Sequence, residues 1–326
     1  MLNKLKLSIV MAVYNGEKYI LKQLDSIRNQ SRVADEVIII DDCSKDSTPE
    51  LVEKYILNHK LKNWQFYRKT ENRGYKRTFY NALSKATGDY VFLCDQDDVW
   101  HLDKIEIMEK LLLEHPQIKT LNTAVTYIDS NDNEIPINNK LFFSNNNLVK
   151  FYVGKYQIKK VPLNEIFVRN ITTGCAMCAS KDIVDSFLKA YDFGLPHDWF
   201  MNILASLKNN GVYYYNTALI NYRLHDNNTI GISDNKTLIS DINGNGKMEL
   251  FEQQILLVNS IYKAKYINEN IKNKIIDVIN MRKKFYMEGN IQTFLKLFGK
   301  IRDYMYIYNY RQVLIDIRKL LKSKLN

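Results

Sequence analysis

The sequence lacks long hydrophobic runs. None of its 326 residues lies in an uncharged apolar stretch of 18 or more, the length that a membrane-spanning helix needs. The first residues, MLNKLKLSIVMAVYNG, become polar too early for a signal peptide and have the pattern of a strand. No low-complexity tract exceeds a few asparagines, and 46% of the residues are apolar. We therefore expect an intracellular protein that does not span a membrane and that forms one large core or two modest ones.

Cysteine is also scarce. The four cysteines, Cys43, Cys94, Cys175 and Cys178, are too few for a disulfide framework in a chain of this length. Cys175 and Cys178 have CxxC spacing, but no second such pair and no nearby histidine completes a zinc site. We expect reduced, buried thiols that pack as small apolar side chains.

Negative charge is scarce at one end of the chain. Residues 247–326 hold 16 Lys and Arg against 7 Asp and Glu, whereas residues 1–246 hold 30 against 29. Nearly all of the formal net charge of +10 therefore lies in the C-terminal quarter. Such a surface attracts an anionic partner, which can be a membrane, a nucleic acid or a phosphorylated substrate. No nucleic-acid-binding motif accompanies the basic residues, so we expect no nucleic acid partner.

The first hundred residues alternate between strand and helix patterns. Continuous apolar runs indicate buried strands, and apolar residues at helical spacing indicate helices. The βαβαβαβ order predicts a mostly parallel sheet with crossover helices, and ligands of such sheets bind beyond the carboxyl ends of the strands. The predicted strands are 7–13, 36–42, 64–69 and 89–95, and the predicted helices are 15–30, 44–59 and 74–87.

Polar side chains follow three of these strands at one edge of the predicted sheet. The stretch VFLCDQDDVW places three carboxylates within four positions at the end of the fourth strand. Because like charges repel one another, this edge requires a compensating cation. The residues that meet at the edge are Tyr14, Asp41, Asp42, Asp95, Asp97 and Asp98.

The rest of the chain is less regular at first. Residues 130–170 are rich in asparagine, which predicts a long excursion, and residues 226–247 predict a mobile connector. Residues 241–252 match the spacing of an EF-hand calcium loop, but they hold few carboxylates and no helix precedes them, which favours a flexible connector. Regular structure is expected at 171–180, in helices over 181–191 and 195–210, in a strand pair at 211–216 and 219–225, and in helices from 248 onward.

Seven segments in fixed order carry a resemblance to a known family. They are SIVMAVYNG (8–16), EVIIIDDCSKDST (36–48), ENRG (71–74), GDYVFLCDQDDVW (88–100), TTGCAM (172–177), PHDWF (196–200) and YRLHDNNTIG (222–231). Over about residues 5–232 the chain resembles the family 2 glycosyltransferases with the GT-A fold, and among them the bacterial rhamnosyltransferase-like group that builds capsular and O-antigen polysaccharides.

The resemblance implies an α/β fold, Rossmann-like, with a mostly parallel central sheet and a C-terminal helical extension. It implies a GT-A catalytic domain over 1–246, followed by a basic helical region over 247–326. Within the catalytic domain, the nucleotide-binding half would span about 1–130 and the acceptor-binding half about 131–246.

Enzymes of this family transfer a sugar from a nucleoside diphosphate to a hydroxyl and invert the anomeric centre. The leaving diphosphate gains negative charge, which a divalent cation stabilises, and hard oxygen ligands suit Mn²⁺ or Mg²⁺. The resemblance implies that Asp95-Gln-Asp97 is the D-x-D motif, with Asp95 near the ribose and Asp97 as the main metal ligand. Asp98 would support them. His225 is a further candidate ligand, because it precedes a loop that would fold over the donor.

The resemblance also implies a nucleotide site at the first two strands. Asp42 would accept a hydrogen bond from the base or ribose, and backbone groups at the end of the first strand would flank the base. Cytosine has no N3–H donor, which favours a UDP or dTDP donor, with dTDP-rhamnose among the candidates. The nucleotide-binding candidates are Ala12, Val13, Tyr14, Asp41, Asp42, Arg73, Arg77 and Asp95, the two arginines being placed near the diphosphate.

One-step inversion needs a base that takes the proton of the acceptor hydroxyl. The resemblance implies that Asp198 is this base and that His197 beside it orients the acceptor, although an aspartate at this position also caps a helix well. Further substrate candidates are Thr173 and Gly174, where a sugar could approach the backbone, Arg223, which could grip the pyrophosphate, and Trp100 and Trp199, which either face sugar rings or pack in the core.

Acceptors in polysaccharide assembly are commonly lipid-diphosphate-linked sugars, so the resemblance implies a cytoplasmic enzyme that is peripheral at the inner face of the cell membrane. The basic C-terminal helices would then bind an anionic membrane surface, form a homo-oligomer or pack on the catalytic domain. Two other functions compete: a non-catalytic carbohydrate-binding or scaffold protein on the same fold, and a sugar-nucleotide pyrophosphorylase. AVYNGEKY lacks the glycine-rich, basic loop that a pyrophosphorylase needs after its first strand.

Overall fold

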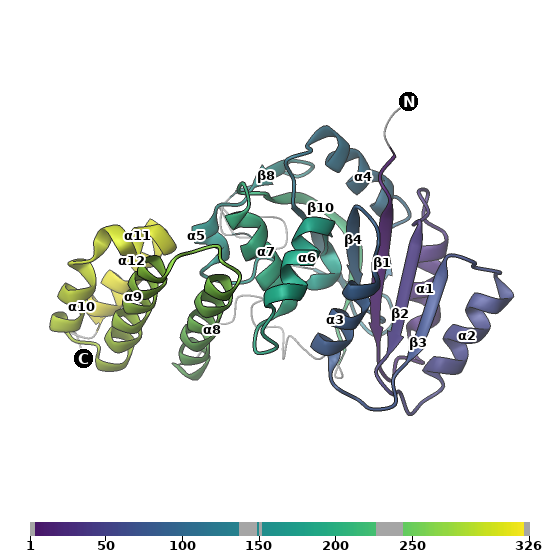
Figure 1. The fold of residues 1–326 in the computed structure, drawn as a ribbon, viewed down its shortest axis with the longest axis horizontal. Coiled ribbons are helices and arrows are strands. Elements are labelled where there is room, and N and C mark those ends of the chain that lie inside the picture. Colours follow the sequence, from purple (N-terminus) through teal and green to yellow (C-terminus); the bar gives the residue numbers. More distant parts are fainter. Residues whose placement is uncertain (1–3, 137–148, 150–151, 226–243, 323–326) are drawn as a thin grey trace.

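The protein consists of a mixed β-sheet between two layers of helices, followed by a helical region at one end (Figure 1). The computed structural model describes residues 4–136, 149, 152–225 and 244–322. The sheet has ten strands, and the order along its main path is β3-β2-β1-β4-β9-β6-β10-β5. The predicted α/β class with a mostly parallel central sheet is therefore confirmed.

The first half of the sheet follows the prediction closely. Strands β1, β2, β3 and β4 pair in parallel, and all residues of β1, β2 and β4 except Ala12 are buried, as expected for continuous apolar runs covered on both faces. Pro49 in the first turn of α2 suits the start of a helix, where its missing N–H removes no hydrogen bond. The elements are β1 (Leu7–Val13), α1 (Ile20–Arg28), β2 (Glu36–Asp41), α2 (Thr48–Asn58), β3 (Trp64–Arg68), α3 (Tyr75–Lys85) and β4 (Tyr90–Cys94).

The second half of the sheet mixes strand directions. Strand β9 runs antiparallel to both β4 and β6, whereas β10 runs parallel to β6. The elements here are β5 (Val99–Trp100), α4 (Lys104–Glu114), β6 (Thr120–Ile128), β7 (Glu134–Ile135), β8 (Ile158–Lys160), α5 (Leu163–Ile166), the 3-10 turn η1 (Gly174–Ala176), β9 (Met177–Ser180), α6 (Lys181–Ala190), α7 (His197–Leu207) and β10 (Val212–Arg223).

The predicted strand pair at 211–216 and 219–225 is wrong, because both segments belong to the single strand β10. Its register against β6 shifts between Tyr215 and Ala218 and again before Asn221. Asn216 is a residue type that is common in turns. Here, however, its backbone N–H donates to the Gln157 carbonyl at 2.9 Å, and its side chain donates to the Val153 carbonyl at 2.5 Å. These bonds keep it in the sheet, as an irregularity and not a turn.

Two hydrophobic layers fill the space on either face of the sheet. Helices α1, α2 and α4 cover one face through residues such as Leu24, Val52 and Met108, and α3, α6 and α7 cover the other. The second layer continues into the C-terminal helices, since Phe251 and Val278 belong to the same buried cluster as Phe79 on α3 and its neighbours. Of the two alternatives that the composition allowed, one large core or two smaller ones, the structure shows two, one on each face of the same sheet.

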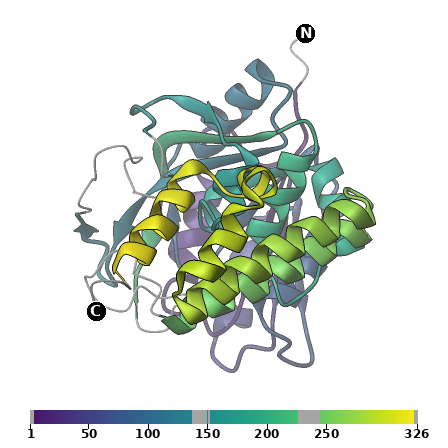
Figure 2. The ribbon, with the colours of Figure 1, turned by 90° about the vertical axis from the view of Figure 1, so that its left-hand side faces the viewer.

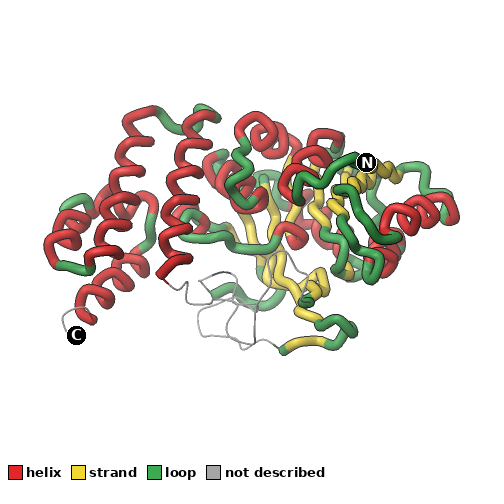
Figure 3. The backbone as a smooth tube through the Cα atoms, turned by 90° about the horizontal axis from the view of Figure 1, so that it is seen from below, coloured by secondary structure: helices red, strands yellow, loops and turns green. Residues whose placement is uncertain are grey.

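The C-terminal helices pack against the helices that cover one face of the sheet (Figures 2 and 3). Gln254 donates to the Phe167 carbonyl at 3.0 Å and accepts from the Tyr308 hydroxyl at 2.7 Å. A buried ion pair, with Arg282 Nε 2.9 Å from Asp316 Oδ2, ties the helices to one another. In the described residues no helix is both long and apolar enough to cross a membrane. The helices are α8 (Gly244–Lys263), α9 (Glu269–Glu288), α10 (Ile291–Phe298), α11 (Ile301–Ile307) and α12 (Tyr310–Lys322).

The segment with EF-hand spacing does not form a loop over its second half. Residues 241–243 lie outside the described residues, and from Gly244 the backbone is helical through Glu252 as the start of α8. An EF-hand loop requires irregular backbone at these positions to bring its ligands around one ion. Calcium binding by this template is therefore excluded for the described half. Of the predicted connector, 226–243 lies outside the described residues and 244–247 is helical.

Candidate active site

A short acidic turn joins β4 to β5 and forms the centre of the site. Asp98 is 1% exposed, and its Oδ1 accepts a hydrogen bond from the Arg223 backbone N–H at 3.1 Å. Its Oδ2 is buried and has no hydrogen-bond partner among the described residues. Burial, followed by the charge of Asp97, raises the pKa of Asp95 to about 7 and raises that of Asp98 well above its usual range. The sequence prediction of mutually repelling carboxylates at this edge is confirmed.

Side-chain hydrogen bonds tie the turn to the end of β1, to α1 and to the segment that follows β10. Gln96 bonds both backbone groups of Tyr14, accepting from its N–H at 2.7 Å and donating to its carbonyl at 2.9 Å. Gln23 on α1 donates to the Asp95 carbonyl at 3.0 Å. His225 Nε2 lies 2.8 Å from Asp97 Oδ2, which brings together two of the three residues that the sequence predicted as metal ligands.

Arg223 lies beneath this turn and not on its surface. Its side chain is fully buried, donates to the Asp97 carbonyl at 2.7 Å and forms an ion pair with Asp132 at 2.6 Å. Its guanidinium also stacks on the Tyr19 ring at 4.5 Å. The expectation that Arg223 grips a pyrophosphate is therefore wrong in this conformation, because its donors hold the acidic turn in place.

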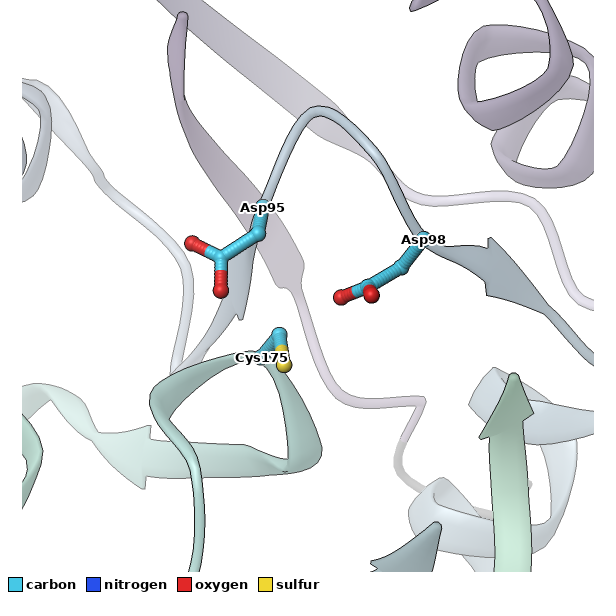
Figure 4. Close-up of side chains that lie close together, drawn as sticks. All are labelled: Asp95, Asp98 and Cys175. Carbon is cyan, nitrogen blue, oxygen red and sulfur yellow. The ribbon is translucent and has the colours of Figure 1, made fainter. Parts of the chain in front are cut away.

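Three potential metal ligands gather around the turn (Figure 4). The ligand atoms of Asp95, Asp98 and Cys175 all lie within 4.8 Å of one another, and Cys175 comes from η1 on the facing side. Burial raises the pKa of the Cys175 thiol well above its usual range, so the oxygen atoms would supply the negative charge.

The buried Asp98 carboxyl, with its unpartnered oxygen, and the half-buried Asp95 carboxyl fit a hard divalent cation such as Mn²⁺ or Mg²⁺. Asp97 and His225 pair beside this group without joining it, so the described residues do not assemble the predicted set of Asp95, Asp97 and His225 as one cluster.

The residues predicted to bind the nucleoside lie at the carboxyl edges of β1 and β2. Asp41 accepts from the Ser44 backbone N–H at 3.0 Å and so fixes the turn after β2. Asp42 Oδ1 accepts from Lys69 Nζ at 3.0 Å and from the Arg73 backbone N–H at 3.0 Å. Asp42 is thus a buried carboxylate already paired with a cation, at the place where the sequence predicted a contact with the nucleoside.

The other residues predicted to contact the nucleotide are Ala12, Val13, Tyr14, Arg73 and Arg77, and most of them already contact other groups of the protein. The Val13 carbonyl accepts from the Asp42 N–H at 2.8 Å, and Ala12 is paired within the sheet, so the end of β1 offers chiefly the Tyr14 side chain, which is 41% exposed. The Arg73 side chain is exposed and pairs with Glu71. Arg77 lies 4.2 Å over the ring of Phe193. Neither guanidinium contacts the acidic turn in any described interaction.

The proposed base lies at the start of α7, facing the acidic turn. Asp198 is 7% exposed and accepts from the Asn170 side chain at 2.7 Å. Asp198 lies near the turn, because a Cβ on Gly174, next to Cys175, would lie 3.7 Å from Asp198 Cβ, and its charge adds to the causes that raise the Asp95 pKa. The first-turn position also makes Asp198 favourable for the helix, so the capping and catalytic interpretations coexist.

His197 is buried beside the base. Its ring stacks on Phe79 with centroids 4.6 Å apart, and neither ring nitrogen has a hydrogen-bond partner in the described part of the chain. Burial lowers the pKa of His197, which favours the neutral ring. A Cβ added to Gly174 would lie 3.0 Å from His197 Nε2, so the absence of a side chain there makes room for the imidazole. Thr173 precedes this glycine, and its hydroxyl lies 3.3 Å from Cys175 Sγ.

The two tryptophans belong to the core, so the prediction that they face sugar rings is wrong. Trp199 is 2% exposed and its indole N–H donates to the Ile166 carbonyl at 2.7 Å. Trp100 is 3% exposed and packs under Lys104, whose Nζ lies 4.4 Å from the ring centroid. Trp199 is thus part of the core, and Trp100, although almost fully buried, is among the residues that line a surface pocket beside α1.

Four residues of the site escaped sequence reasoning. Gln96 was read only as the middle of the D-x-D motif, and Lys69 only as the last residue of a strand at the correct edge. Asn170 comes from the irregular asparagine-rich region, and Cys175 was interpreted only as a buried thiol; only the fold brings them to Asp198 and Asp95. A search of all strand ends for polar residues would have found Lys69.

Comparison with known proteins identifies the architecture and the family. Residues 8–169 match the description "Glycosyl transferase family 2". The dTDP-rhamnosyl transferase RfbG of Shigella flexneri is 28% identical over 233 residues, which cover 68% of this chain and 73% of that protein. The poly(ribitol-phosphate) beta-N-acetylglucosaminyltransferase TarS of Staphylococcus aureus is 34% identical over 113 residues, 34% of this chain, and the match spans about a fifth of TarS.

A solved structure supports the fold. The crystal structure of S. aureus TarS 1-349 in complex with UDP has a TM-score of 0.57 at 21% identity, and the match covers 85% of this chain and 71% of that one. This likeness confirms the predicted GT-A fold. Through residues 8–169, this chain belongs to glycosyl transferase family 2, and it is a glycosyltransferase.

Proposed function

We propose that this enzyme transfers a sugar from a UDP or dTDP donor to a hydroxyl of a glycan or lipid-linked acceptor, with inversion, in surface polysaccharide biosynthesis. The observation that carries the proposal is that η1 touches both groups: Cys175 is grouped with Asp95 and Asp98, and a Cβ on the adjacent Gly174 would lie 3.7 Å from Asp198 Cβ. One-step inversion requires a base near the group that holds the leaving diphosphate. Residues 1–246 would form the catalytic unit, with the nucleotide in the first half and the acceptor in the second.

The donor would bind across the carboxyl edges of β1, β2 and β4. Asp42, whose Oδ1 lies 3.0 Å from Lys69 Nζ, would meet the nucleoside, and Lys69 would hold this buried side chain in place. Similarity to a dTDP-rhamnosyl transferase and to a UDP-bound structure favours a thymine or uracil base, both of which carry the N3–H that a carboxylate accepts.

A divalent cation would be held by Asp95 and Asp98, whose ligand atoms the structure brings together, and the neighbouring Asp97–His225 pair, which the sequence predicted as ligands, would complete the site by moving toward the ion. When bound, Mn²⁺ or Mg²⁺ supplies positive charge that stabilises the diphosphate as it leaves. The protein keeps this turn fixed with Arg223 and Gln96, which bond its backbone and that of the neighbouring β1.

Proton transfer falls to Asp198. The acceptor oxygen forms a bond to the anomeric carbon, its proton passes to the Asp198 carboxylate, and the electron pair of the breaking C1–O bond leaves with the nucleoside diphosphate. Asn170 orients Asp198 by donating to Oδ2, while the buried neutral His197 ring keeps water away from one side of the carboxylate.

The test compares two substitutions. Asp198→Asn should lower sugar transfer by about 100-fold or more while leaving UDP binding unchanged, because only the base is lost. Asp97→Asn should instead abolish the effect of Mn²⁺ on nucleotide binding. A thermal-shift panel of UDP-, dTDP- and GDP-sugars with Mn²⁺ identifies the donor, since bound nucleotide raises the melting temperature. Glu53→Gln, on the exposed surface of α2, is the control. Full transfer by Asp198→Asn would contradict the assignment.

We further propose that the C-terminal helices bind an anionic membrane surface. Helix α10 exposes Ile291, Leu295 and Phe298 along one stripe, with exposed fractions of 43%, 58% and 48%. Exposed basic residues such as Lys296 and Arg318 lie on the same helices. This combination suits an interface between lipid headgroups and acyl chains.

Because α8–α12 share the main core, truncation at 247 would open that core, so a surface substitution is the sharper test. Leu295→Glu with Phe298→Glu should reduce flotation with vesicles that contain phosphatidylglycerol, and Leu57→Glu on exposed α2 should not. Equal flotation of both proteins would contradict membrane binding, and a change of oligomeric state in the first variant would favour a homo-oligomer.

A further inference from the structure

A cavity lies between α3 and the segment that joins α6 to α7. Its volume is about 250 Å³. Three aromatic side chains, Tyr80, Tyr191 and Phe193, form part of its wall, and Arg73 and Arg77 stand at its edge. The lining contains none of the carboxylates of the acidic turn or of the nucleotide end.

The lining combines the two kinds of group that bind a charged sugar. Aromatic faces stack against the apolar face of a sugar ring, and guanidinium groups bind phosphate or carboxylate with paired hydrogen bonds. Arg77 lies 4.2 Å over the Phe193 ring, and among the described residues no carboxylate pairs with it. Arg73 pairs with the exposed Glu71, a partner that a bound anion could replace at small cost.

The aromatic wall is rigid. The Tyr80 hydroxyl donates to the Leu188 carbonyl at 3.0 Å, and the Tyr191 hydroxyl donates to the Leu195 carbonyl at 2.7 Å. The rings of Tyr191 and Phe193 are in edge contact with centroids 5.1 Å apart. A wall that is already ordered loses little entropy when a ligand binds.

The segment that joins α6 to α7 forms part of the cavity wall and leads directly to Asp198, the proposed base. Lys76 Nζ donates to the Phe193 carbonyl at 3.0 Å, and the Tyr75 ring lies 6.0 Å from that of His197. Phe193 is five residues before Asp198. Burial and then the charges of Tyr75 and Asp198 raise the pKa of Tyr191, which places this wall within electrostatic reach of the base.

We propose that this cavity binds an anionic group, a phosphate or carboxylate, attached to the acceptor glycan, and that Arg77 is its main contact. The proposal rests on the proposed function and specifies its acceptor as an acidic or phosphate-bearing sugar. It also reassigns Arg77, which the sequence placed at the donor diphosphate. The other charges near the cavity are Lys76, which adds to the positive field, and Asp192, whose Oδ1 accepts from the Gly194 N–H at 2.9 Å.

The experiment measures binding to the full chain by calorimetry or NMR. UDP with Mn²⁺ is titrated first, and glucose 1-phosphate, glucuronic acid and methyl glucoside are then titrated with UDP saturating, so that the donor site is blocked. Glucose 1-phosphate or glucuronic acid should bind about tenfold more tightly than neutral methyl glucoside, the range of one charge-assisted hydrogen bond. The better of the two anions shows whether phosphate or carboxylate is preferred.

Two variants separate the interpretations. Arg77→Gln should weaken the preferred anion about tenfold and leave UDP and methyl glucoside unchanged. Arg68→Gln, an exposed arginine on β3 that pairs with Glu50, should change nothing. The proposal is overturned if no anion binds saturably, if the neutral sugar binds equally well, or if Arg77→Gln weakens UDP and not the anion. Failure of UDP to bind the wild-type chain would count against the proposed function instead.

Discussion

The Asp95 carboxyl gives the metal-free protein a pH-dependent stability. Burial, the charge of Asp97 and then that of Asp198 raise its pKa from 3.8 to about 7. Because this value lies above that of the unfolded chain, the folded protein holds the proton more tightly than the unfolded one. The resulting stabilisation is complete below about pH 4 and is lost as the pH rises through about 7.

The size of the effect follows from the shift. Between about pH 5.5 and about pH 8, a carboxyl whose pKa is 3.8 unfolded and about 7 folded lowers the free energy of unfolding by about 2 kcal/mol. At about 2.1 cal/mol/K per residue, the unfolding entropy of 326 residues is about 0.7 kcal/mol/K. The melting temperature should therefore fall by about 3 °C over this range on account of Asp95 alone.

The assay is differential scanning calorimetry in EDTA at both pH values. In Asp95→Asn, which mimics the neutral acid, the fall between the two pH values should be about 3 °C smaller than in the wild type, whereas Glu53→Gln should behave as the wild type. Added Mn²⁺ competes with protons for the carboxyls, so it should raise the wild-type melting temperature more at the higher pH. Equal pH dependence of the wild type and Asp95→Asn would refute the reasoning.

Three further predictions concern packing. Gly174→Ala should lower transfer activity with little loss of stability, because its Cβ would approach His197 Nε2 to 3.0 Å and displace the ring beside the base; steady-state kinetics with an unchanged melting temperature checks this. Arg282→Leu should destabilise the C-terminal helices by about 3–5 kcal/mol, since it leaves Asp316 buried without its cation, and urea denaturation measures it. Trp199→Phe should cost about 1–3 kcal/mol in the same assay through an unpaired buried carbonyl, and unchanged stability would show that water replaces the indole.

The sequence predicted which polar residues lie at the strand ends, but it did not predict which residues each side chain contacts. The apolar runs that become β1, β2 and β4 end in polar residues, so the position of the acidic turn at one sheet edge followed from periodicity and topology. Arg223 and Trp199 looked like ligand contacts because both are polar or aromatic and close to motifs. Their burial depends on residues more than 30 positions away, Asp97 and Ile166 among them, which no local pattern reveals.

By itself, the sequence determined the α/β sheet, the family and the carboxylates that face one another across the site, because hydrophobic period and motif order are local properties of the chain. Only the tertiary structure decided that Asp95 meets Cys175 and Asp98, that Lys69 neutralises Asp42, and that the basic C-terminal helices close over the main core. These contacts join segments far apart in the chain. They are fixed by the packing of a whole sheet with its helices, and that packing sets which charges are buried and which remain for a ligand.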